Sequence, residues 1–283
     1  MLFTTADGVE LFYEVLGPRA SVLRPTGQTD PLDNGGPRPE ARGPVVLLNG
    51  IMMTTRSWEP LLPALTPRFR CVLHDFRGQL RSPDRGPFNI EQHADDLDAL
   101  LDHLDIERVH VVGTSYGGEV GMIFAYTYPE RTRSLTVIAS ASRADEHMRL
   151  RSFEAMNVAM IERDRLYDVV ARDFFSPEFR SAHPEVLSEE RSRIATYGDD
   201  YFAGYVSLCD AFSALDITEN LRAIHCPALV IAAERDTLKP VRCSEGIANE
   251  IDGARLMVVP NAGHAVVIER PDDISRALLE FLG

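Results

Sequence analysis

Short apolar runs recur along the chain, separated by longer stretches with helical spacing. The runs cover residues 45–49, 71–75, 109–113, 135–140, 228–233 and 256–260. Continuous apolar runs are typical of strands buried on both faces of a parallel sheet. Between two of them, apolar residues from Ile90 to Leu104 recur at steps of three and four, which predicts an amphipathic helix. The alternation predicts an α/β fold, with a mostly parallel, doubly wound sheet and helices on both sides.

Three segments depart from this alternation. Residues 2–5 and 9–16 flank the turn sequence Ala6-Asp7-Gly8, which predicts a hairpin. Residues 17–44 are rich in Pro, Gly, Asp and Asn, which predicts an extended surface loop. Residues 143–221 contain helical patterns with many aromatic residues and no strong strand pattern. We expect a helical cap there, inserted between core segments 1–142 and 222–283. Its aromatic residues form the core of the cap, and a minority of them, Phe175 and Tyr205 included, also line a pocket.

Composition narrows the classes of partner and the compartment. The 283 residues have a formal net charge of -14 and contain no Lys/Arg-rich run, which argues against nucleic acid and anionic membranes as partners. No apolar stretch approaches the roughly 18 residues of a membrane span, and the N-terminus lacks the pattern of a secretory signal. The four cysteines form no C-x-x-C pair. We therefore expect a cytoplasmic protein with reduced thiols, and the oligomeric state stays open, a homo-oligomer included.

The sequence Gly113-Thr114-Ser115-Tyr116-Gly117 matches the pattern G-x-S-x-G directly after a predicted strand. A serine on a sharp strand-to-helix turn lies at the carboxyl end of the strand, where ligands bind in open α/β sheets. Small residues two positions to either side let neighbouring backbone pass close to the turn. Ser115 is therefore the candidate nucleophile.

A nucleophilic serine needs a base. Of the eight histidines, only His264 follows a late apolar run on a loop that starts with Asn and Gly. Asp236 follows the preceding apolar run, where a carboxylate can orient the imidazole. Ser115, Asp236 and His264 have the chain order of a Ser-Asp-His triad on such a sheet. Glu234 is the second candidate for the acid and Asp145 the third.

These residues resemble the α/β-hydrolase superfamily over nearly the whole chain. Residues 48–58, LNGIMMTTRSW, resemble the loop that donates the second oxyanion N–H, and residues 74–83, HDFRGQLRSP, resemble the D-x-R-G-x-G-x-S turn. Residues 263–271, GHAVVIERP, are similar to G-H-x-x-x-x-E-x-P. The resemblance implies an oxyanion hole made by the backbone N–H groups of Tyr116 and Ile51, with Met52 as the alternative donor.

Two departures from the family pattern bear on function. Asn49-Gly50 replaces His-Gly, and together with Trp58 and residues 85–115 it resembles the 3-oxoadipate enol-lactonases. Gln79-Leu80-Arg81 replaces G-x-G, from which we expect a reshaped loop and no lost activity. In a second interpretation, Arg81 contacts a substrate carboxylate.

The resulting hypothesis is a serine hydrolase that cleaves a small carboxylic ester or lactone through an acyl-enzyme on Ser115. No H-E-x-x-H, paired C-x-x-C or G-x-G-x-x-G appears, so no metal or nucleotide cofactor is implied. Within the same fold, carbon–carbon bond hydrolysis of the meta-cleavage type and thioesterase or perhydrolase activity stay open. A ligand-binding receptor with an inactive site is the alternative from a different class.

Overall fold

The computed structural model of the chain describes residues 1–18 and 42–283. The predicted loop at residues 17–44 therefore lies almost wholly outside the described residues. Among the described residues, no helix is both long enough and apolar enough to cross a membrane.

The centre of the molecule is an eight-stranded sheet in the order β1-β2-β4-β3-β5-β6-β7-β8. The hairpin strands β1 and β2 run antiparallel to their neighbours, and all other pairs are parallel. The strands are β1 (Leu2–Thr4), β2 (Glu10–Leu16), β3 (Val45–Leu48), β4 (Cys71–His74), β5 (Val109–Thr114), β6 (Thr132–Ile138), β7 (Ala228–Ala233) and β8 (Arg255–Val259). The predicted fold class and the predicted hairpin are confirmed.

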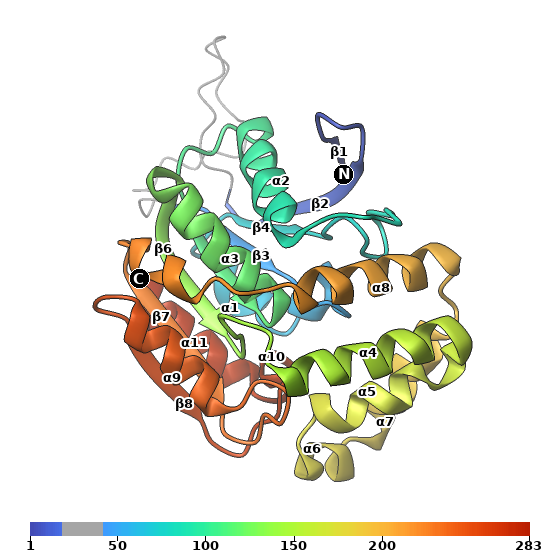
Figure 1. Cartoon of the computed structure of the whole chain (residues 1–283). Helices are drawn as coiled ribbons and strands as arrows, with labels where there is room; N and C mark the ends of the chain where they lie inside the picture. The colour runs from blue at the N-terminus through green and yellow to red at the C-terminus, as the bar shows by residue number, and fades with distance from the viewer. Residues whose placement is uncertain (19–41) are drawn as a thin grey trace.

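Side chains of the central strands alternate between two hydrophobic cores, because successive residues of a strand point to opposite faces. In β3, Val46 and Leu48 pack with helices α2 and α3, whereas Val45 and Leu47 pack with α1 and α11. The helices that cover the sheet are α1 (Leu62–Leu65), α2 (Ile90–His103), α3 (Tyr116–Thr127), α9 (Val241–Glu250), α10 (Val266–Glu269) and α11 (Pro271–Leu282) (Figure 1).

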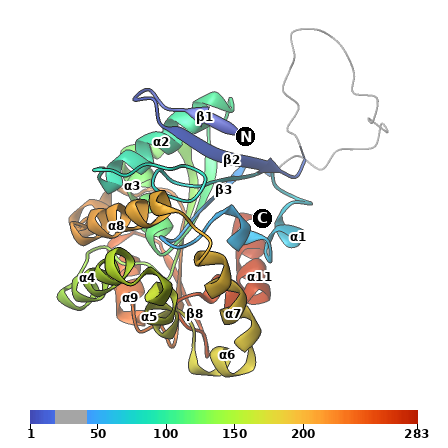
Figure 2. The same ribbon diagram turned by 90° about the vertical axis from the view of Figure 1, so that its right-hand side faces the viewer.

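A helical segment, residues 146–213, follows β6. It consists of α4 (Glu146–Ile161), α5 (Leu166–Phe174), α6 (Pro177–Ala182), α7 (Pro184–Ile194) and α8 (Asp199–Ser213). These helices share a hydrophobic core of their own. In Figures 1 and 2, α4 to α7 lie together at the end of the molecule away from the β1–β2 hairpin.

Two contacts fasten the helical segment to the loop after β8. The Glu269 carboxylate accepts hydrogen bonds from the Ser176 backbone N–H and hydroxyl, both at 2.7 Å. The Ala265 N–H donates to the Phe174 carbonyl at 2.7 Å. The residues just before α6 are thus attached directly to the loop that carries His264.

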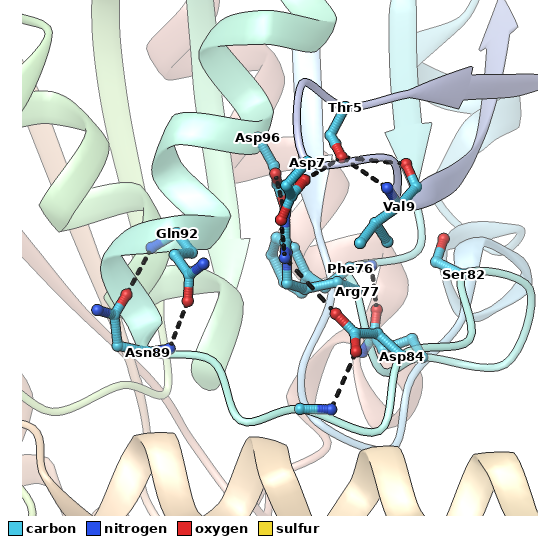
Figure 3. Close-up of polar contacts among 12 residues, drawn as sticks. Thr5, Asp7, Val9, Phe76, Arg77, Ser82, Asp84, Asn89, Gln92 and Asp96 are labelled. Atoms are coloured by element: carbon cyan, nitrogen blue, oxygen red, sulfur yellow. Dashed lines mark hydrogen bonds and ion pairs between the residues drawn. The ribbon is translucent and has the colours of Figure 1, made fainter.

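At the opposite end, the buried Arg77 joins three parts of the chain (Figure 3). Its guanidinium makes two 2.7 Å hydrogen bonds to the Asp96 carboxylate of α2, and it contacts Asp7 of the hairpin turn at 2.9 Å and Asp84 at 3.5 Å. The hydrogen bonds to Arg77 and Thr5 lower the pKa of Asp7 to about 2. These charge-assisted contacts fix the loop after β4, which passes next to the candidate site.

Candidate active site

Ser115 occupies a strained turn between β5 and α3. Its backbone has φ 53° and ψ -121°, a region that non-glycine residues adopt at a cost of about 1–3 kcal/mol. The turn is possible only because its neighbours are small. A Cβ on Gly113 would lie 2.1 Å from the Gly117 carbonyl oxygen, and one on Gly117 would lie 2.1 Å from the Leu48 carbonyl oxygen. The G-x-S-x-G pattern therefore has a steric cause in this chain.

The structure brings Ser115, His264 and Asp236 together. The His264 Nε2 lies 2.9 Å from the Ser115 Oγ, and its Nδ1 lies 2.7 Å from the Asp236 Oδ2. Asp236 follows β7 and His264 follows β8, so both loops reach Ser115 at the carboxyl ends of the strands. The other oxygen of Asp236 accepts the backbone N–H groups of Leu238 at 2.9 Å and Lys239 at 2.8 Å. Backbone hydrogen bonds thus hold the Asp236 carboxylate in place independently of its contact with the imidazole.

The two other acids considered for this position lie elsewhere. The Glu234 carboxylate is exposed and accepts the Asn261 N–H at 2.7 Å, so it shapes the loop before His264. Asp145 caps the start of α4, where it accepts the Met148 N–H at 2.9 Å. Neither of them contacts His264 in the described part of the chain.

The loop after β3 approaches Ser115 and is fixed by a buried polar network. The Asn49 amide donates to the His74 carbonyl at 3.0 Å and to Gln79 at 3.1 Å, and it accepts the Trp58 indole N–H at 2.9 Å. The Gln79 amide in turn donates to the carbonyls of Gly50 at 2.8 Å and Ile51 at 3.2 Å. Gln79, which departs from the family pattern, therefore supports the backbone of this loop.

Two backbone N–H groups lie on the loops next to Ser115. With the carbonyls of Gly50 and Ile51 bonded to Gln79, the Ile51 N–H makes no hydrogen bond within residues 1–18 and 42–283. The Tyr116 N–H belongs to the first turn of α3, where helical N–H groups have no partner within the helix. A Cβ on Gly50 would lie 3.4 Å from the Ser115 Cβ, which shows how closely the two loops approach.

Arg81 does not face this space. Its Nε donates to the Asp75 carboxylate at 2.9 Å, and its guanidinium lies 3.7 Å from the centre of the Phe12 ring. The second interpretation, contact of Arg81 with a substrate carboxylate, finds no support, because Arg81 is not among the residues that line the cavity at Ser115.

Sequence reasoning missed a buried ion pair beside the serine. Lys239, three residues after Asp236, forms an ion pair with Glu119, one turn of α3 after Ser115. The Lys239 Nζ also lies 3.2 Å from the Ser115 Oγ. The signal available in the sequence was compositional: among 29 Lys and Arg residues, Lys239 is the one lysine.

A cavity of about 190 Å³ opens at Ser115 and His264. Its polar groups are few, and most of its wall is apolar. The helical segment contributes, among others, Ala155, Tyr167, Val170, Phe174, Phe175, Ile194, Tyr205 and Phe212. The expected pocket-lining aromatics Phe175 and Tyr205 are both in this wall.

Two other histidines are fully buried and have no polar partner for either ring nitrogen among the described residues: His74 of β4 and His93 of α2. Burial lowers the pKa of His74 to about 4 and that of His93 well below the ordinary value. Both rings pack edge-on or tilted against Phe76. They are neutral core residues, and the His93 ring packs against the Tyr116 ring at 5.4 Å between ring centres.

Comparison with known proteins agrees with this architecture. The family model described as alpha/beta hydrolase fold matches residues 43–271. A protein of Caulobacter sp. (strain K31) named "Putative carbamate hydrolase RutD" is 32% identical over 258 residues, covering 88% of this chain and 93% of its own.

Among solved structures, the enol-lactonase from Burkholderia xenovorans LB400 is 27% identical with a TM-score of 0.84, covering 100% of this chain and 99% of its own. A hydrolase from Pseudomonas aeruginosa PA01 is 28% identical with a TM-score of 0.84, covering 100% of this chain and 98% of its own. The match of the family model over most of the chain, together with the sheet order, shows that this protein belongs to the α/β hydrolase fold family.

Proposed function

We propose that this protein is a serine hydrolase that cleaves a small carboxylic ester or lactone through an acyl-enzyme on Ser115. The observation that carries the proposal is the continuous hydrogen-bonded series from Asp236 through His264 to Ser115, which ends in a cavity. A nucleophile and base within hydrogen-bond reach, with the base oriented by a third group, is the arrangement that nucleophilic catalysis requires.

In the proposed reaction, the Ser115 Oγ attacks the carbonyl carbon while His264 takes the hydroxyl proton. Asp236 keeps the imidazole oriented and stabilises the imidazolium. His264 then gives the proton to the leaving alcohol. In the second half, His264 takes a proton from water, which attacks the acyl-enzyme, and returns it to the Ser115 Oγ as the acid leaves.

The N–H groups of Ile51 and Tyr116 are proposed to bind the oxyanion of each tetrahedral intermediate. The support is positional, because both lie on the loops that meet at Ser115 and neither is used by the loop or turn structure around it. Such donors act when negative charge develops on the carbonyl oxygen.

The cavity and the relatives narrow the substrate class. A mostly apolar wall around about 190 Å³ suits a small acyl or lactone group. One relative of known structure is an enol-lactonase, which favours a lactone or ester. The curated relatives are named for carbamate hydrolysis, which makes a carbamate the second candidate, because a carbamate carbonyl is open to the same attack by Ser115.

The test combines covalent labelling with a substrate panel. A fluorophosphonate should attach to Ser115 in the parent, and Ser115→Ala should remain folded, resist labelling and lose activity by about 10⁶-fold. Purified protein should be assayed on p-nitrophenyl esters, lactones, carbamates and ring-fission products. If Ser115→Ala keeps activity within tenfold of the parent, or if the label attaches elsewhere, the assignment is wrong.

A further inference from the structure

The buried Lys239–Glu119 pair lies in contact with the reacting oxygen of the proposed nucleophile. Lys239 and Glu119 are 6% and 0% exposed, and the Lys239 Nζ is 3.2 Å from the Ser115 Oγ. The Glu119 Oε1 that pairs with Lys239 also accepts the Ala141 N–H at 3.1 Å. The Phe212 ring of α8 lies beneath the ammonium, 4.6 Å from Nζ to the ring centre. Burying a lysine and a glutamate costs several kcal/mol per ion unless each is well paired, so this placement requires an explanation.

Hydrogen-bond accounting assigns the proton of Ser115. An ammonium has three donors and no acceptor, whereas a hydroxyl has one donor and two acceptor lone pairs. Lys239 must therefore donate to the Ser115 Oγ, and the hydroxyl proton has to point elsewhere. The acceptor at hand is the His264 Nε2, 2.9 Å away. The Lys239 contact thus selects the one rotamer of the hydroxyl that places its proton on the line to the base.

We propose that Lys239 is a fourth catalytic residue, which directs the Ser115 proton to His264 and stabilises the negative charge that develops on the Ser115 Oγ. The proposal rests on the proposed function. As the proton passes from Oγ to Nε2 and the bond from Oγ to the carbonyl carbon forms, the Lys239 proton stays on Nζ. In the second half the acyl–Oγ bond breaks, its electron pair returns to Oγ, and His264 supplies the proton.

Glu119 acts as a positioning residue for this ammonium. Burial raises the pKa of the Glu119 carboxyl and the neighbouring Lys239 opposes that rise, as expected for a buried ion pair. The Lys239 backbone N–H is bonded to Asp236, so the same short segment orients the acid of the triad and delivers the ammonium. The pair is connected to the triad at both ends, through α3 to Ser115 and through the loop after β7 to Asp236.

The choice of lysine agrees with this role. The chain uses arginine at all its other 28 cationic side-chain positions. An ammonium is a compact charge with tetrahedral donors, whereas a guanidinium is planar and broad. The Lys239 ammonium contacts Glu119, the Ser115 Oγ and the face of the Phe212 ring at once.

The first experiment measures the rate constant of fluorophosphonate labelling at saturating probe for the parent, Lys239→Met and the double variant Lys239→Met/Glu119→Gln. We expect a loss of about 10²-fold in both variants, the lower end of the range for removing one preorganised donor. The double variant separates catalysis from folding, because it leaves no unpaired buried charge. Arg242→Met is the matched control, since it removes an exposed cation from the same segment and should label at the parent rate.

The outcomes decide between a catalytic and a structural role. If the folded double variant labels within threefold of the parent, Lys239 serves only to neutralise Glu119 and the proposal is overturned. If Lys239→Met does not fold, the double variant alone decides. A parent that is not labelled at Ser115 contradicts the proposed function itself, whereas a labelled parent with unaffected variants contradicts only the role of Lys239.

A second readout exploits the single lysine. Protein grown with ¹³Cε-labelled lysine should show one lysine resonance, which reports on Lys239 alone. We expect that resonance to shift when the fluorophosphonate reacts at Ser115, because the bonded Oγ changes from a hydroxyl to an ester oxygen. A resonance that does not move would place the ammonium away from the Ser115 Oγ and overturn the proposal.

Discussion

The wall of the cavity has two parts that are built in different ways. One part comes from loops at the carboxyl ends of β3, β5, β7 and β8, and it presents backbone and polar groups such as Ile51, Ser115 and His264. The other part comes from the helical segment and presents apolar side chains such as Val170, Phe175 and Tyr205.

The two parts also differ in how well they tolerate substitutions. The loops pack backbone against backbone, and a Cβ on Gly113 or Gly117 would collide with a carbonyl oxygen. The helical segment packs side chains against side chains in a core of its own, which repacks more easily than backbone. We therefore expect the loops to set the reaction rate for every substrate and the helical segment to set the ranking among substrates.

The largest expected effect on the loop side after Ser115 itself is at the acid. Asp236→Asn keeps the volume but favours the wrong tautomer of His264, and activity should drop about 10⁴-fold. Glu234→Gln is the matched control, because its carboxylate bonds the Asn261 N–H and not the imidazole. Steady-state kinetics on one ester measure both. The opposite result, with Glu234→Gln the damaging change, would mean that the acid was misassigned.

A smaller loss is expected at the loop after β3. Gly50→Val places methyl groups against Met53 and Ser115 and should displace the Ile51 N–H. Losing one oxyanion donor costs about 10²–10³ in kcat. The loss should be similar for all substrates, because the donor acts mainly in the transition state. If instead the ranking of substrates changes while kcat for the best substrate stays the same, this loop determines specificity, as we expect of the helical segment.

Changes in the helical segment should do the reverse. Phe175→Ala and Tyr205→Ala remove side-chain atoms from the apolar wall and so enlarge the cavity. We expect the ratio of kcat/KM between a short and a long acyl ester to change by about 10- to 200-fold, as for one or a few buried methylenes. The labelling rate at Ser115 with a small fluorophosphonate should change much less. A uniform loss across all esters would contradict the division between the two parts.

The smallest expected effect concerns the free energy of unfolding at acid pH, which depends on a histidine buried in the core beside the sheet. Because burial lowers the pKa of His93 in the folded state, only the unfolded chain takes up that proton below about pH 6.5, so stability falls as the pH falls. His93→Phe should reduce the slope of unfolding free energy with pH by up to about 1.4 kcal/mol per pH unit near pH 5. Urea unfolding at several pH values provides the measurement.

Much of the sheet was predictable because each parallel strand is apolar on both faces. The run at residues 228–233 matches β7 exactly as predicted, whereas β6 begins at Thr132, before the apolar run. The early residues of β6 are polar but still pair with β5, where the Ser134 hydroxyl meets the His110 ring at 2.7 Å. A pattern of apolar residues alone does not predict that polar residues at the start of a strand pair with a neighbouring strand.

The positions of Ser115, Asp236 and His264 were predictable for a similar reason, since each follows a predicted strand and parallel strands end at one edge. Glu119 and Lys239 were not, because their meeting depends on how the loop after β7 packs on α3. The Gln79 support for Gly50 and Ile51 is also tertiary. Neither local periodicity nor spacing carries this information.

The single lysine also determines how the protein can be handled in chemical experiments. Because Lys239 is the one lysine of the chain and is buried, amine-directed crosslinkers and biotinylation reagents find no exposed lysine. Attachment to a surface through lysine would have to enter the cavity. Tethering at arginine, carboxylate or introduced cysteine positions therefore leaves Lys239 untouched.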